Sequence, residues 1–129
     1  MTAIKWVSDA VLDAALSYIS ANADQLSVCT DLGSSPTYST ATTAGTRLAI
    51  KTGMTSGDFT GPAAGSQRQL TVNQQATLSV TNSGTAANVA LTKSSGSVLL
   101  YMTTCTSQVL TSGNTVTVPS WVISIASPT

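Results

Sequence analysis

Beyond residue 25 the sequence breaks into short runs of β-branched and apolar residues, and turn residues separate one run from the next. The turns carry Gly, Ser and Asn, as in residues 82–84 and 112–114. Short strands divided by such turns are typical of antiparallel β-sandwiches and barrels. We therefore predict a mainly β fold, a single antiparallel sandwich or barrel over residues 26–126. The expected strands cover residues 26–30, 47–51, 69–75, 77–81, 87–92, 98–104, 115–118 and 121–125.

Residues 8–22 have a helical pattern instead. Ser8 is a suitable N-cap, and apolar side chains recur at helical spacing after it. We expect one N-terminal amphipathic helix that buries Val11, Leu12, Ala15, Leu16 and Ile19 with Tyr18 beside them. Asp13 and Ser17 would then lie on the opposite, solvent-facing side. Residues 1–7 form an arm before this helix, and the whole chain, 1–129, is predicted to be one domain.

Two long segments, residues 31–45 and 52–66, are rich in Gly, Ser, Thr and Pro and are interpreted as loops. Long loops often carry function. These loops are nearly neutral, which suits contact with a protein surface better than capture of a charged ligand. Tyr38 in the first loop and Phe59 in the second are the aromatic residues that we expect to contact a partner.

Charged residues are scarce, at 8% of the 129 residues, with no His, no Glu and a formal net charge of zero. Most catalytic and metal sites are built from His, Cys, Asp, Glu and Lys, so the sequence predicts no enzyme, no metal and no cofactor. The absence of a basic stripe argues against nucleic-acid binding. No apolar run approaches membrane-spanning length, and no secretory signal is recognised, so we expect synthesis in the cytoplasm and no membrane contact.

The two cysteines, Cys29 and Cys105, lie far apart in sequence and belong to no Cys-x-x-Cys pair. They are interpreted as buried, small apolar side chains. A disulfide between them stays open as an alternative if their strands are neighbours.

The two tryptophans have different contexts. Trp121 opens the last expected strand and alternates with Ile123 and Ile125, which indicates a core position. Trp6 lies in the arm, between Ile4 and Val7, and either folds back onto its own domain or inserts into a neighbouring subunit. Since Trp is frequent at interface hot spots, Ile4, Trp6 and Val7 are candidate contact residues.

Several segments together resemble a known group of proteins. They are residues 8–16, the strand 26–29, the Pro-Thr-Tyr of 36–38, residues 90–93, Leu100-Tyr101 and residues 110–115. The set is similar to small virion-associated proteins of tailed double-stranded DNA bacteriophages, of the capsid decoration or cement type. The resemblance implies a β-rich, often homotrimeric protein on the outer capsid surface that clamps the major capsid protein across capsomer boundaries without covalent bonds.

The sequence thus predicts a structural virion protein made in the host bacterial cytoplasm, with the arm and the two loops as its contacts. Two alternatives remain open. The chain could belong to the phage tail, the head–tail connector or a fibre base, or it could be a carbohydrate-binding β-sandwich.

Overall fold

The structure is a computed structural model that describes residues 6–63 and 67–126. Its elements follow the chain in the order α1 (Asp9–Asn22), β1 (Gln25–Cys29), α2 (Tyr38–Thr42), β2 (Arg47–Thr52), η1 (Ser56–Asp58), β3 (Phe59–Ala63), β4 (Arg68–Val72), β5 (Gln75–Ser79), β6 (Gly84–Lys93), β7 (Val98–Leu110), β8 (Thr115–Val118) and β9 (Trp121–Ile125). All the strand pairs of its sheets are antiparallel. The predicted class, mainly β with one long N-terminal helix, is confirmed.

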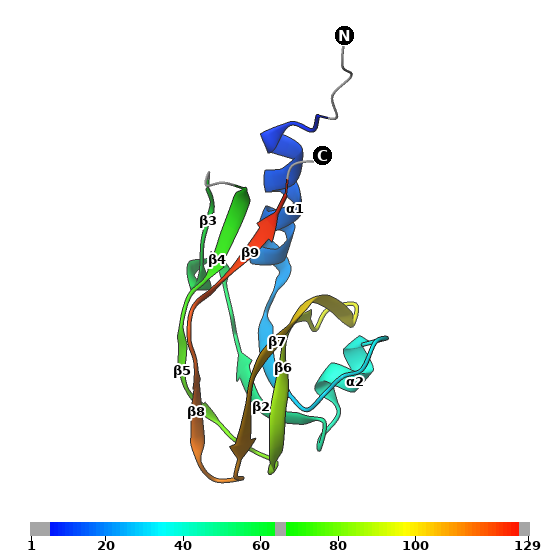
Figure 1. Ribbon diagram of the computed structural model, residues 1–129, viewed down its shortest axis with the longest axis vertical. Helices are drawn as coiled ribbons and strands as arrows, with labels where there is room; N and C mark the ends of the chain where they lie inside the picture. Colours follow the sequence, from blue (N-terminus) through cyan, green and yellow to red (C-terminus); the bar gives the residue numbers. More distant parts are fainter. Residues whose placement is uncertain (1–5, 64–66, 127–129) are drawn as a thin grey trace.

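The strands form two regions along the length of the molecule (Figure 1). One region holds the sheet β3-β4-β9, with α1 along it. The other holds the four-stranded sheet β2-β1-β6-β7 and the pair β5-β8. A single bridge, between Ala49 and Val80, connects β2 to the chain just beyond β5. The sheets therefore curve around a common core without closing into a barrel.

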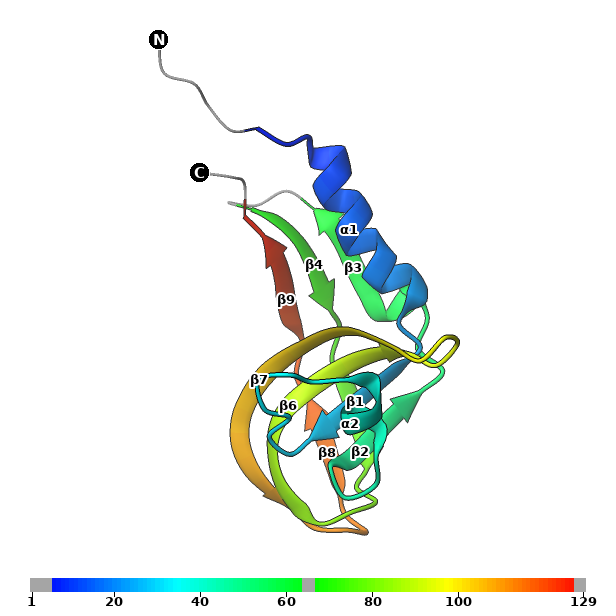
Figure 2. The same cartoon turned by 90° about the vertical axis from the view of Figure 1, so that its right-hand side faces the viewer.

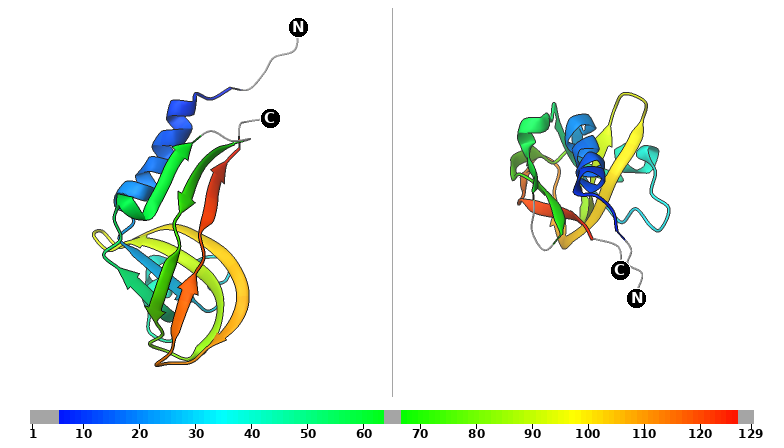
Figure 3. Two further views of the ribbon diagram at one scale, coloured as in Figure 1. Left: turned by 90° about the vertical axis from the view of Figure 1, so that its left-hand side faces the viewer. Right: turned by 90° about the horizontal axis from the view of Figure 1, so that it is seen from above.

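A two-stranded ribbon connects the two regions. The segment β4–β5 pairs with β9 in the first region and with β8 in the second, since β4 bonds to β9 and β5 bonds to β8. The ribbon is interrupted where Pro119 separates β8 from β9. Proline lacks the N–H that a strand ladder needs, so this is the place where the ribbon can bend from one sheet into the other. Figure 3 shows the ribbon running the length of the molecule.

α1 is fixed to the sheet by one apolar stripe and one ion pair. Leu12 and Leu16 are buried and Ile19 is half-buried, at the spacing of one helix face. Arg68 at the start of β4 donates Nε and Nη2 to the two carboxylate oxygens of Asp13, at 2.7 and 2.8 Å. A bidentate pair fixes direction as well as distance, so the helix has a defined position on the sheet.

The buried face of α1 is narrower than the sequence indicated. Val11, Ala15 and Tyr18 were expected on it but are exposed, whereas Asp13, expected on the solvent side, pairs with Arg68. The helix packs on β3 and β4 with the side that carries Leu12, Asp13 and Leu16, so Val11, Ala15 and Tyr18 point away from the sheet.

Both predicted loops contain regular structure. The segment 31–45 includes α2, which begins with a capping box between Thr37 and Thr40 and lies against the outer face of the four-stranded sheet (Figure 2). The segment 52–66 includes η1 and β3. The last predicted central strand, 98–104, extends to Leu110 because its second half pairs with the start of β6.

The core predicts a clear difference between two positions of α1. Leu16 is fully buried, so Leu16→Ala leaves a cavity and is expected to lower the free energy of unfolding by about 2–5 kcal/mol. Val11→Ala, at a position 58% exposed, is expected to change it by less than about 0.5 kcal/mol. Urea unfolding measures both, and equal losses would contradict the helix orientation described above.

Candidate functional site

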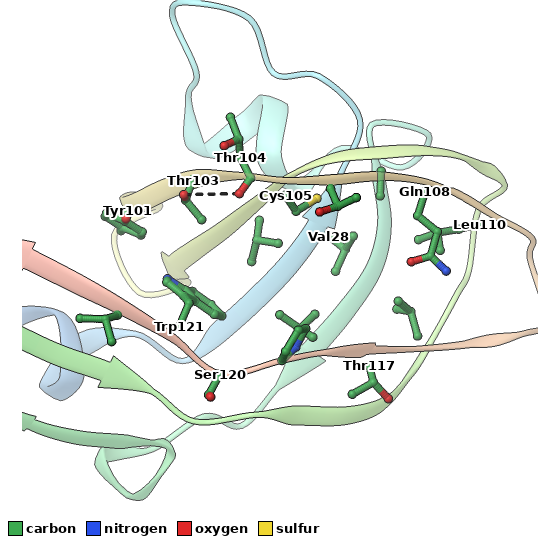
Figure 4. A pocket seen from close by; sticks show the side chains of 17 residues that line it. Val28, Tyr101, Thr103, Thr104, Cys105, Gln108, Leu110, Thr117, Ser120 and Trp121 are labelled. Carbon is green, nitrogen blue, oxygen red and sulfur yellow. Dashed lines mark hydrogen bonds between the residues drawn. The ribbon is translucent and has the colours of Figure 1, made fainter.

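The sheet system has an open seam between β7 and β8. In the part of the chain that the structure describes, β7 pairs only with β6, and β8 pairs only with β5. Each strand thus keeps one edge whose backbone N–H and C=O groups lack a neighbouring strand. Both edges border the same groove, which Figure 4 shows from close by.

The groove in this seam is neutral. It has a volume of about 590 Å³ and is lined by apolar side chains together with Thr, Ser and Gln, and none of the described residues that line it is charged. Val28 and Val89 come from β1 and β6, Thr103 and Cys105 from β7, and Trp121 from the start of β9. Such a surface suits an uncharged chain segment better than an ionic substrate.

One polar atom in the groove wall is unsatisfied. The indole Nε1 of Trp121 is shielded from solvent and has no hydrogen-bond acceptor among the described residues. A buried donor without an acceptor costs about 1–3 kcal/mol. Trp121 is otherwise half-buried and packs on the main core, as its alternation with Ile123 indicated.

The sequence-predicted contact residues do not form one site. Trp6 is 78% exposed at the start of the described chain, and Val7 is half-buried; Ile4 lies outside the described residues. Tyr38 is half-buried at the first position of α2. Phe59 is 7% exposed and belongs to the core. Its expected role as a contact residue is corrected, because β3 pairs with β4 and turns this ring inward.

A surface that the sequence interpretation missed lies on the outer side of α1. Val11 is 58% exposed and Tyr18 is 53% exposed. The exposed helical positions between and around them are mostly alanine, and we call this surface the outer face of α1; it consists of Ala10, Val11, Ala14, Ala15, Tyr18 and Ala21. The signal in the sequence was the absence of Lys and Arg from the helix, which a solvent-facing helix side normally carries.

Four of the five acidic side chains accept hydrogen bonds within the described residues. Besides the Asp13–Arg68 pair, Asp24 accepts hydrogen bonds from the Ser94 backbone and hydroxyl, and these lower its pKa. Asp58 accepts from the Thr55 backbone N–H at 2.9 Å and from the Gln75 amide at 3.1 Å. The carboxylates therefore hold turns and elements together. No group of three or more His, Cys, Asp or Glu side chains that could hold a metal occurs within residues 6–63 and 67–126.

The cysteines do not form the disulfide that the sequence left open. Both are free thiols, and β6 lies between their strands. Neighbouring strands are about 4.8 Å apart, so strands two places apart exceed the ~4.4–6.8 Å Cα separation of a disulfide. Their side chains also point to opposite faces of the sheet. Cys29 packs with Ala41 under α2, and Cys105 packs against the main core.

Among the described residues, no helix has the length and apolar character needed to cross a membrane. Comparisons with models of known protein families, with curated proteins and with solved structures found no match.

The two thiols should differ in reactivity. Burial raises the pKa of Cys29 to about 12, and burial also raises that of the less buried Cys105. Because only the thiolate reacts, we expect iodoacetamide at pH 8 to label Cys105→Ser protein at least about tenfold more slowly than Cys29→Ser protein. Both variants should label equally in denaturant. Fast labelling of Cys29 in the native protein would contradict its place under α2.

Proposed function

We propose that this chain is a structural component of a tailed-phage particle, bound to the outer capsid surface as a decoration protein. Three features support the proposal: the resemblance carried by the segments named above, from residues 8–16 to residues 110–115, the neutral composition, and the outer face of α1. The outer face of α1 is the main support for the proposal, because this face can serve as a contact surface for the major capsid protein.

The outer face of α1 has the properties of a protein contact. It is apolar and uncharged, and Val11 and Tyr18 lie seven residues apart on it, which is two helical turns. A soluble surface helix normally carries charge on this side. The opposite side is held by Leu12, Leu16 and the Asp13–Arg68 pair, so the contact surface is rigid before binding and loses little entropy on docking.

Weak contacts of this kind are sufficient on a shell. If the protein is a homotrimer, as the resemblance implies, three outer faces engage neighbouring capsid subunits together. The second and third contacts are then intramolecular and raise the apparent affinity well above that of one face. A contact across a capsomer boundary stabilises the shell because it must break when capsomers separate.

The alternative within the particle is a tail, connector or fibre-base component. The same apolar face would then meet other copies in a ring. The carbohydrate-binding alternative has less support, since Phe59 is in the core and Tyr38 and Tyr101 are half-buried on different elements.

Capsid binding tests the proposal. Tyr18→Asp places a charge at the centre of the proposed contact and is expected to raise the Kd for capsids that lack the protein by at least about tenfold, as measured by co-sedimentation. Ala76→Asp introduces the same charge at an exposed residue of β5, away from both α1 and the groove, and serves as the control with unchanged binding.

Equal capsid binding by both variants would show that the outer face of α1 does not contact the capsid. Failure of the unaltered protein to bind capsids, together with a sixfold ring in solution, would assign it to the tail or the connector instead.

A further inference from the structure

We propose that the groove between β7 and β8 receives the N-terminal segment of a second copy of this chain, residues 1–7, as an added β-strand. This inference concerns contacts between copies and does not depend on the capsid proposal.

The acceptor is built from two strand edges. β7 runs from Val98 to Leu110 and β8 from Thr115 to Val118, and within the described chain neither has a partner on the side of the groove. A strand that enters between them can bond to backbone groups and place alternate side chains against the groove floor. Val28, Ala86 and Val89 form that floor and are buried, so its apolar character is already fixed by the core.

The chemistry of the segment matches that of the groove. Residues 1–7 contain no proline and one charged side chain, Lys5. In an extended strand successive side chains point to opposite sides, so Ile4 and Trp6 share one side and Lys5 lies on the other. The apolar side can face the uncharged groove while the ammonium group stays in water.

The length of the segment indicates that it comes from a second copy, because it is too short to reach the groove of its own chain. The described chain begins at the end of the molecule that lies away from β8 (Figure 1). α1 has 14 residues and is therefore about 21 Å long. Five residues before Trp6 span at most about 18 Å when fully extended. The strands β7 and β8 that border the groove lie beyond the C-terminal end of α1 (Figure 2), so a chain's own segment falls short of the groove.

Two independent observations point to an occupant. Trp6 is a large side chain that is 78% exposed, and Trp121 in the groove wall has an indole N–H without an acceptor in the described residues. A strand in the groove brings backbone carbonyl groups next to Trp121, and it buries Trp6. The same docking event thus gives both groups a partner.

The contact restricts how the copies can assemble. Each copy donates its segment at one end and accepts another at the groove, which is a heterologous interface. Such an interface closes into a ring when the rotation between copies allows it. Two copies that exchange their segments reciprocally form a closed dimer, and three or more copies form a ring.

The experiment compares the full chain with a variant that lacks residues 2–7. The deletion leaves α1 and its Ser8 cap in place. Sedimentation velocity is expected to show an oligomer for the full chain and a monomer for the variant, with equal circular dichroism. Hydrogen exchange should be slower in residues 103–110 and 115–118 of the full chain than in the variant.

A peptide of residues 1–9 supplies the second arm of the test. Labelled with fluorescein, it is expected to bind the shortened protein saturably at one site per chain. A peptide with Ile4→Lys and Trp6→Lys, the matched control, should bind at least about tenfold more weakly.

An oligomer that survives the deletion, a monomeric full chain, or a peptide that does not bind would each overturn the proposal. A monomeric full chain that needs residues 1–7 to bind capsids would assign the segment to the capsid.

Discussion

The ribbon in which β4–β5 pairs with β9 and β8 is the constraint on which the rest of the structure depends. One half of it forms the sheet that holds α1, and the other half faces the four-stranded sheet across the core. Buried side chains from both regions, such as Leu16, Leu70, Val28 and Leu91, belong to one cluster. Because β8 is paired to β5 and β7 to β6, the curved sheets stay open on one side, and the neutral groove lies in that opening.

The local sequence pattern was sufficient to predict α1 and several of the strands. β8 and β9 lie where alternation placed them, at Thr115–Val118 and Trp121–Ile125, and α1 begins after the expected Ser8 cap. These segments have a strong periodicity or a capping residue, and their tertiary contacts agree with that local preference. The strand β3 was missed because Gly61 and Pro62 indicate a loop, and only pairing with β4 makes that segment a strand. Such pairing is non-local and cannot be deduced from a short window.

The candidate surfaces were harder to predict for the same reason. Val11 and Tyr18 lie on an apolar side of the helix, and a hydrophobic pattern alone assigns that side to the core. The side of the helix that faces β3 and β4 buries Leu12 and Leu16, whereas Val11, Ala15 and Tyr18 are exposed. The groove depends on how β7 and β8 diverge, and no local signal in either strand reports the distance to the other. Both surfaces lack charged side chains, in keeping with the low charge content of the chain, but that composition alone did not locate them.

We propose that this protein acts by contact, with a rigid apolar helix face for a shell and a strand-accepting groove for its own copies. The most direct test of this proposal is a cryo-electron microscopy reconstruction of the phage particle that carries this chain. We expect density for this fold on the outside of the shell at capsomer boundaries, with the outer face of α1 against the capsid protein. Density in a sixfold ring of the tail or connector, or absence of the chain from the particle, would contradict it.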